Sequence, residues 1–265
     1  MGLRLDWELA RRGYRRYAAY PAATVAGLFT NTVFGFMIAY ILLGLYRHRT
    51  HVGGYSESDT LTYVWITQAM LAPMAAWGWY ELALRIRTGD IATDLTRPVD
   101  PLRAGLAFDY GRALYQAIFR GLPPLVVGAL VFDLTAPRNP LVWVAFFVSV
   151  GLAVGVSFGF RFLYNSTAFW LLHYRGVVVI SALVVSLFSG LYIPVVFFPG
   201  WLKAIAYATP FPAMLQIPVD VFVGHREGSE IVVALLVQCG WLVLLLGACR
   251  VVFAAGTRRL VVQGG

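Results

Sequence analysis

The residues best suited to chemistry are seven charged side chains between positions 85 and 103. They are Arg85, Arg87, Asp90, Asp94, Arg97, Asp100 and Arg103. Mixed charges at this density suit ionic docking to a protein surface rather than bond breaking. Asp90 can cap a short helix that starts at Ile91, Pro98 ends that helix, and Asp100 before Pro101 starts the next one. The pattern predicts a short charged helix that docks a soluble partner, and it fits a solvated connector equally well.

Other reactive residues are few and scattered. Four of them would have to converge at one membrane face to form a lipid-modifying centre: Glu81, Asp109, Arg112 and His173. They are better explained as ends of membrane spans. His48 and His51 suit a surface loop better than a metal site. The chain has no phosphate-binding loop and no His/Cys cluster with zinc spacing. We therefore expect no catalytic residue, metal or cofactor on this chain.

The composition indicates what positions these residues. Hydrophobic residues make up 59% of the 265 positions and charged residues 13%, whereas soluble domains have about 45–50% and about 25%. This excludes a soluble enzyme, a disordered chain and a disulfide scaffold. Backbone groups in hydrocarbon must bond within a helix, so we predict an all-α integral membrane protein. Its six predicted spans are residues 21–45, 61–84, 113–132, 141–163, 176–198 and 231–255.

The distribution of charge predicts the orientation. The third predicted span, 113–132, has the weakest hydrophobic signal, because it contains two prolines and Arg120. This arginine can snorkel from near a helix end. Most of the 21 basic residues fall on the side that holds both termini. Positive loops stay in the cytoplasm, so both termini are predicted to be cytoplasmic. The net charge of +8 is then explained by membrane sidedness, and we expect no nucleic-acid partner.

Two further segments flank or interrupt the spans. Residues 1–20 place aromatic and basic side chains in separate helical sectors, which predicts an amphipathic interfacial helix before a single transmembrane domain at 21–265. A solvated basic tail is the alternative. The segment 198–224 is apolar but broken by four prolines, so its pieces are too short to span. We predict outer re-entrant half-helices between spans five and six, acting either as a gate or as a cap on the bundle.

These features together resemble one family. Nearly the whole chain is similar to permease subunits of the type-2 class of ATP-binding-cassette exporters, most closely a bacterial subfamily of paired permeases. The resemblance rests on the amphipathic N-terminal helix, the six spans and three motifs. These are Ile-Arg-Thr-Gly-Asp-Ile…Arg-Pro-Val-Asp-Pro at 86–101, Phe-Phe-Pro-Gly-Trp-Leu…Thr-Pro-Phe-Pro at 197–212, and a tail with Arg258-Arg259 and Gln263-Gly264-Gly265.

The resemblance implies roles for these segments. The 85–103 segment would be a coupling helix on a cytosolic ATPase, which would bind ATP and Mg²⁺. A second six-span permease, identical or different, would complete the path in a bacterial inner membrane. The outer gate would comprise Phe198, Trp201, Pro210 and Phe211. The interfacial helix would anchor to membrane lipids through Trp7, Arg11, Arg12, Arg15 and Arg16.

Three other functions stay open. The spans carry almost no ionisable groups at mid-depth, which argues against a carrier driven by an ion gradient. An ion-independent channel or facilitator, a membrane-embedded lipid-modifying enzyme and an accessory assembly subunit are the alternatives. Binding to a soluble ATPase separates the exporter permease from all three.

Overall fold

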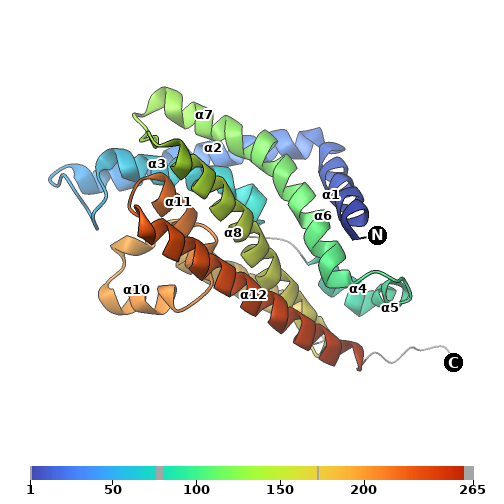
Figure 1. Cartoon of the computed structure of the whole chain (residues 1–265). Helices are drawn as coiled ribbons and strands as arrows, with labels where there is room; N and C mark the ends of the chain where they lie inside the picture. The colour runs from blue at the N-terminus through green and yellow to red at the C-terminus, as the bar shows by residue number, and fades with distance from the viewer. Residues whose placement is uncertain (1, 76–79, 172, 260–265) are drawn as a thin grey trace.

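The computed structural model of the chain describes residues 2–75, 80–171 and 173–259. Most of these residues lie in helices, and the one strand-like pairing among them is an isolated bridge between Val52 and Tyr55. The predicted all-α structure is therefore confirmed. The α-helices (Figure 1) are α1 (Gly2–Ala18), α2 (Pro21–Leu43), α3 (Glu57–Met74), α4 (Glu81–Thr88), α5 (Asp90–Leu95), α6 (Pro101–Gln116), α7 (Leu122–Val131), α8 (Pro140–Ser166), α9 (Tyr174–Phe188), α10 (Gly200–Tyr207), α11 (Gln216–Phe222) and α12 (Ser229–Thr257).

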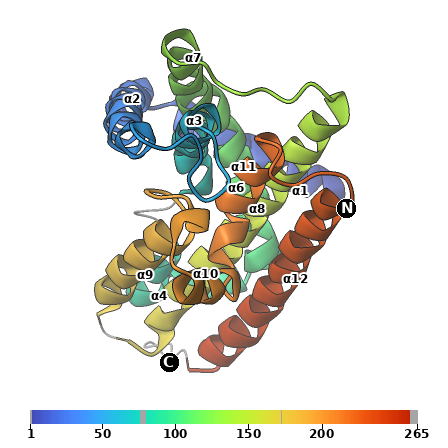
Figure 2. The ribbon, with the colours of Figure 1, turned by 90° about the vertical axis from the view of Figure 1, so that its left-hand side faces the viewer.

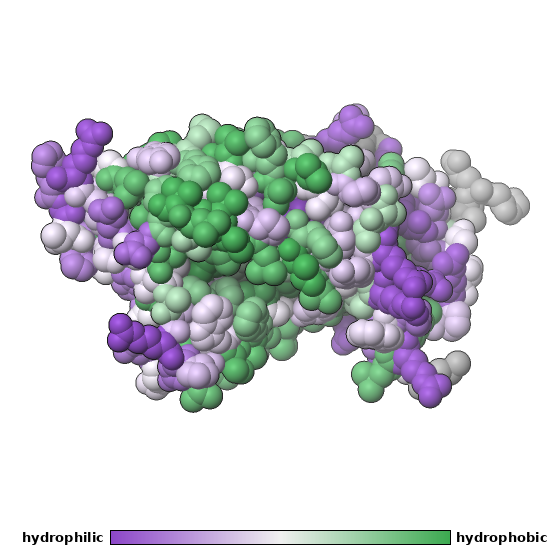
Figure 3. All heavy atoms as spheres, turned by 90° about the horizontal axis from the view of Figure 1, so that it is seen from above, coloured by the Kyte–Doolittle hydropathy of each residue, from purple (hydrophilic) through white to green (hydrophobic). Residues whose placement is uncertain are grey.

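Four helical stretches are long and apolar enough to cross a membrane. They are Pro21–Tyr46, Pro101–Val131, Pro140–Phe169 and Ser229–Thr257. They correspond to the first, third, fourth and sixth predicted spans. The face formed by α2 and α7 is a hydrophobic band with hydrophilic residues gathered at its ends, as expected for a surface in contact with lipid (Figure 3).

The second and fifth predicted spans differ from the structure. Instead of one helix over 61–84, α3 begins at Glu57, where Ser56 and Asp59 form a capping box, and ends at Met74. Positions 76–79 of that predicted span lie outside the described residues, as do Gln263–Gly265 of the tail motif. The fifth predicted span, 176–198, was too long because α9 ends at Phe188. Gly190 then turns the chain with a φ of 87°, which side chains disfavour.

The third predicted span starts earlier than expected and is not interrupted by its prolines. The helix that Asp100 caps at Pro101 continues through a π-helical turn, η2 (Ala117–Gly121), into α7. The Leu122 N–H bonds to Ala117, five residues back, which accommodates the wider turn before the two prolines. Arg120 lies in this turn beside Gly27 of α2, so the prediction that it lies near a helix end was wrong.

The predicted N-terminal helix is present as α1, and it packs lengthwise on α6 (Figure 1). A methyl group on Gly111 would overlap the backbone of Ala10, so the two helices are in direct backbone contact. Tyr14 meets Tyr115 edge-on at 5.3 Å between ring centroids. Part of the predicted aromatic face is thus covered by protein, while Trp7 remains 70% exposed. The anchoring role of Trp7 stays a prediction.

The helix α8 is central to the arrangement. It packs along α12 and contacts α11, while α2, α3 and α7 form a group on one side and α9 and α10 lie on the other (Figure 2). Every residue of α11 is buried. The short helices expected between the last two predicted spans are therefore present, and α8 connects them to the end of the molecule that carries α4 and α5.

Candidate functional site

The charged segment predicted from the sequence folds as the end of α4, the short helix α5 and the start of α6. Gly89, with a φ of 82°, ends α4 and directly precedes α5. Asp90 is the first residue of α5 and its carboxylate accepts a hydrogen bond from the Thr88 hydroxyl at 2.7 Å. Its predicted role as a helix cap was wrong. Asp100 does cap α6, accepting from the N–H of Leu102 at 2.9 Å.

The helix α5 is firmly attached to the bundle. Ile91 is only 1% exposed and belongs to a buried cluster with Leu82 and Ile86. Asp94 pairs with Arg85 at 2.6 Å. A helix of six residues is not stable alone, so these contacts with α4 supply its order.

The seven predicted docking residues divide into two groups. Arg87, Asp90 and Arg97 are exposed and form no ion pair within the described part of the chain. The other residues bond within the chain: Arg85 with Asp94, Asp100 at the α6 cap, and Arg103 with Asp6 of α1 at 2.6 Å. Docking through the seven residues stays a prediction, and four of them also hold ion-pair or capping contacts within the chain.

A buried ion cluster lies behind this segment. The Asp109 carboxylate accepts from Arg112 and from Arg161, each at 2.6 Å, and all three side chains are 3–4% exposed. Arg112 also donates to the carbonyls of Ala72 at 2.9 Å and Pro73 at 2.6 Å. These carbonyls lie in the last turn of α3, where a helix lacks its own donors. The cluster therefore ties the end of α3 to α6 and α8.

Three of the four residues considered for a lipid-modifying centre lie around one cavity. Glu81, Asp109 and Arg112 line one cavity of about 370 Å³, whereas His173 does not. Glu81 is engaged by Arg16 at 2.9 Å, and Asp109 by two guanidinium groups. Both carboxylates hold structural ion pairs, and neither lies beside a histidine that would relay a proton.

The predicted gate residues differ in how far they are exposed. Trp201 on α10 is 68% exposed. Phe211 is buried, packing edge-on against Phe160 of α8 at 5.0 Å between ring centroids. Phe198 and Pro210 are partly buried at the ends of the segment that contains α10. Phe211 thus belongs to the core, while Trp201 projects from the fold.

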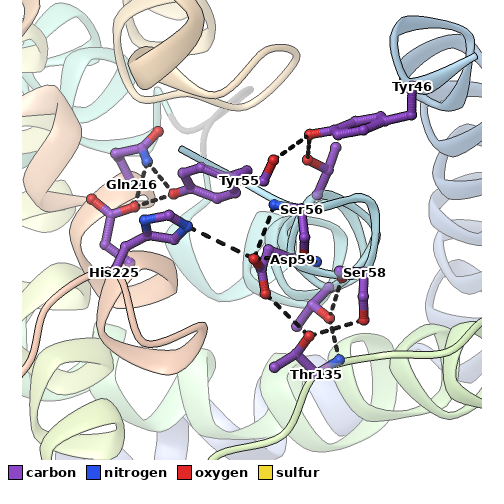
Figure 4. Close-up of polar contacts among 11 residues, drawn as sticks. Tyr46, Tyr55, Ser56, Ser58, Asp59, Thr135, Gln216 and His225 are labelled. Carbon is purple, nitrogen blue, oxygen red and sulfur yellow. Dashed lines mark hydrogen bonds and ion pairs between the residues drawn. The ribbon is translucent and has the colours of Figure 1, made fainter. Parts of the chain in front are cut away.

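A polar network links α11 to the rest of the molecule (Figure 4). The Tyr55 hydroxyl donates to Asp220, and the Gln216 amide donates to Asp220 at 2.6 Å. The Gln216 carbonyl oxygen accepts from the Tyr63 hydroxyl at 2.9 Å and from the Val195 N–H at 2.7 Å. This one amide joins α3, α11 and the segment after α9.

Charged groups complete the network. Arg226 lies 3.6 Å from the Asp220 carboxylate. His225 stacks on Tyr55 at 3.9 Å between ring centroids and faces Asp59 at 3.9 Å. Burial raises the pKa of Asp220 and of Tyr55 above their ordinary values. This network was not predicted from the sequence because its members are far apart along the chain; Tyr55 and Asp220, for example, are separated by 165 positions.

Comparison with protein families decides the class. The model of a family described as ABC-2 family transporter protein matches residues 29–264, which is most of the chain. The chain belongs to this family. Two further comparisons, with curated proteins and with solved structures, gave no match. The resemblance found in the sequence is therefore confirmed.

An ABC-2 transporter chain of this kind is a multi-pass membrane protein and the permease component of an ABC transporter. Such permeases generally work with ABC ATPase subunits and are not generally enzymes themselves. In this ABC-2 permease, the charged segment and the buried cluster share one cavity, since Arg85, Asp94 and Arg97 line it together with Asp109 and Arg112.

Proposed function

We propose that this chain forms a translocation path together with a second permease, identical or different, and is driven by separate cytosolic ATPase subunits that bind ATP and Mg²⁺. The transport direction is export across a bacterial inner membrane. The observation that carries the proposal is the attachment of α5. Buried Ile91 and the Arg85–Asp94 pair fix this helix to α4. A partner that binds the exposed charges of α5 and displaces it would therefore move the helix bundle as well.

The buried ion cluster supplies the next step of the coupling. Arg112 holds the end of α3, and Arg161 belongs to α8, with Asp109 between them on α6. Breaking a buried ion pair is costly, about 3–5 kcal/mol. We call the charged segment 85–103 the coupling segment. When it is displaced, the three helices therefore move together.

Six crossings with both termini in the cytoplasm complete the proposal. Beside the four long helices, α3 has 18 residues and α9 has 15, giving lengths of about 27 and 22 Å at 1.5 Å per residue. They would be the second and fifth crossings. The outer helices α10 and α11 would then form the exit side, with Trp201 at the gate.

A pull-down in detergent tests the coupling role. The tagged chain is purified from its native host and its partners are identified by mass spectrometry. We expect a soluble ATPase with a phosphate-binding loop in the wild-type sample and about tenfold less of it with Asp90→Arg. Glu8→Arg on α1 is the matched control, because it makes the same change of charge at an exposed site. Recovery of the wild-type chain with no ATPase would refute the proposal and favour a channel or facilitator.

A further inference from the structure

The cavity beneath the coupling segment has features that ATPase docking does not explain. It measures about 370 Å³ and lies between α1, α4, α5, α6 and α8. Its apolar lining includes Leu9, Leu82, Ile91, Phe108 and Phe158. Small-molecule sites typically have about 300–1,000 Å³ and a largely apolar lining with a few polar groups. The cavity is thus large enough for part of a lipid.

The polar lining of the cavity has an excess of positive charge. Five arginines face three carboxylates: Arg12, Arg16, Arg85, Arg97 and Arg112 against Glu81, Asp94 and Asp109. Each carboxylate is already paired with a guanidinium at 2.9 Å or less. Arg12 and Arg97 have no acidic partner within 4 Å in the described part of the chain. Two free guanidinium groups therefore line the same cavity as a set of aliphatic and aromatic side chains.

We propose that this cavity binds an anionic phospholipid of the cytoplasmic leaflet. Its phosphate would bind Arg12 and Arg97, and an acyl chain would lie along the apolar lining. Guanidinium groups suit phosphate because they donate two parallel hydrogen bonds. A free phosphate would use the two arginines but would leave the apolar lining in water. An amphipathic anion satisfies both parts of the cavity.

The position of the cavity favours a lipid over a soluble anion. Arg12 comes from α1, whose exposed Trp7 suits the membrane interface. α1 leads directly into α2, the first membrane-crossing helix. Arg97 follows α5 and lines the same cavity. A phosphate between them would join α1 to the coupling segment, so the lipid would stiffen the region that receives the force of the ATPase. This site goes beyond the proposed coupling role, because it requires only the permease chain.

Lipid binding can be measured on the purified chain without an ATPase. Delipidated protein in detergent is titrated with phosphatidylglycerol or phosphatidylcholine, and retained lipid is counted by native mass spectrometry. We expect the wild type to prefer phosphatidylglycerol at least tenfold. Near a membrane surface each arginine contributes about fivefold in affinity, so Arg12→Gln with Arg97→Gln should abolish that preference. The control variant Arg4→Gln with Arg15→Gln loses two positive charges from α1 outside the cavity. It should retain the preference for phosphatidylglycerol.

Two further arms separate the alternatives. Ala104→Trp fills the cavity without changing its charge and should also lose the lipid, with far-ultraviolet circular dichroism as the check on folding. Inorganic phosphate at about 10 mM would occupy a site with a dissociation constant in the millimolar range. It should not displace the lipid. If both double-glutamine variants lose the preference for phosphatidylglycerol equally, general surface charge explains the binding and the proposed site is wrong. Displacement by phosphate, or retention in the double variant of Arg12 and Arg97, would overturn it as well. A failure here leaves ATPase recovery in the pull-down unaffected.

Discussion

Asp109 and Arg161 form an ion pair of 2.6 Å between residues 52 positions apart, and both side chains are almost completely buried. The pair joins α6 to α8, and Arg112 extends it to the end of α3. Asp109→Asn would leave two buried guanidinium groups without their counter-charge. We expect a loss of about 3–5 kcal/mol in the free energy of unfolding, measured by thermal unfolding in detergent.

Glu81→Gln provides the control for that prediction. It breaks the Arg16–Glu81 pair, whose side chains are about half exposed. Exposed pairs contribute about 0–1 kcal/mol. A similar loss of unfolding free energy in both variants would show that the buried Asp109 cluster stabilises the fold no more than an exposed ion pair does.

The second prediction concerns the pair that orients α5. Asp94→Arg places two positive charges together beside Arg85, which should displace α5 and reduce ATPase recovery in the pull-down. Arg85→Asp in the same chain restores opposite charges, and we expect recovery of at least half of the docking. If the exchanged pair stays defective while the fold is intact, Asp94 contacts the ATPase directly instead of positioning α5.

The third prediction tests the contact of α1 with α6. Gly111→Ala places a methyl group on the backbone of Ala10 and should force the two helices apart. Overpacking of this kind costs about 1–3 kcal/mol, and thermal unfolding with proteolysis of α1 would report it. Gly247→Ala on α12 meets no atom within 4 Å, so it should be neutral or slightly stabilising.

The fourth prediction concerns pH. Burial raises the pKa of Asp220 from 3.8 in the folded chain. As the pH rises above 3.8, the unfolded chain loses this proton first, so the folded chain binds more protons and stability falls. We expect the stability of the wild type to decline from pH 4 upward until the folded pKa is passed. Asp220→Asn should reduce that slope, and identical slopes would contradict the assignment.

The fifth prediction separates the gate from the core. Trp201→Ala removes an exposed ring and should change transport while leaving ATPase recovery and thermal stability unchanged. Phe211→Ala removes a buried ring that packs on Phe160, so it should cost about 3–5 kcal/mol of stability. A loss of stability with Trp201→Ala would assign that residue to the fold instead of the gate.

The predictions from sequence succeeded where a local signal existed. Asp100 before Pro101 marked the start of α6, and the long apolar runs marked α2, α8 and α12. They failed where tertiary contacts decide the outcome. Asp90 is not a cap because Gly89 turns the chain before it. The span expected to reach residue 198 ends at Phe188, since Gly190 redirects the chain beside Tyr63 and Gln216.

The candidate site shows the same division. The charged segment 85–103 could be predicted from its charges and from the cap and proline signals within it. The ion cluster of Asp109, Arg112 and Arg161 could not, because its partners come from different helices. The spacing of Asp109 and Arg112, three apart on one helix, was the one local sign of it.

The aromatic contacts along α8 give the two ends of the molecule a common mechanical element. Near its first turns, Trp143 and Phe146 pack against Phe222 of α11. Sixteen residues beyond Phe146, Phe162 lines the cavity between α1, α4, α5, α6 and α8, a distance of roughly 24 Å along the axis. Over that length, a rotation of α8 by about 10° around Phe162 displaces the turn that carries Phe146 by roughly 4 Å. A small rotation at one end of α8 would therefore shift the buried contact with Phe222 by about the width of a side chain.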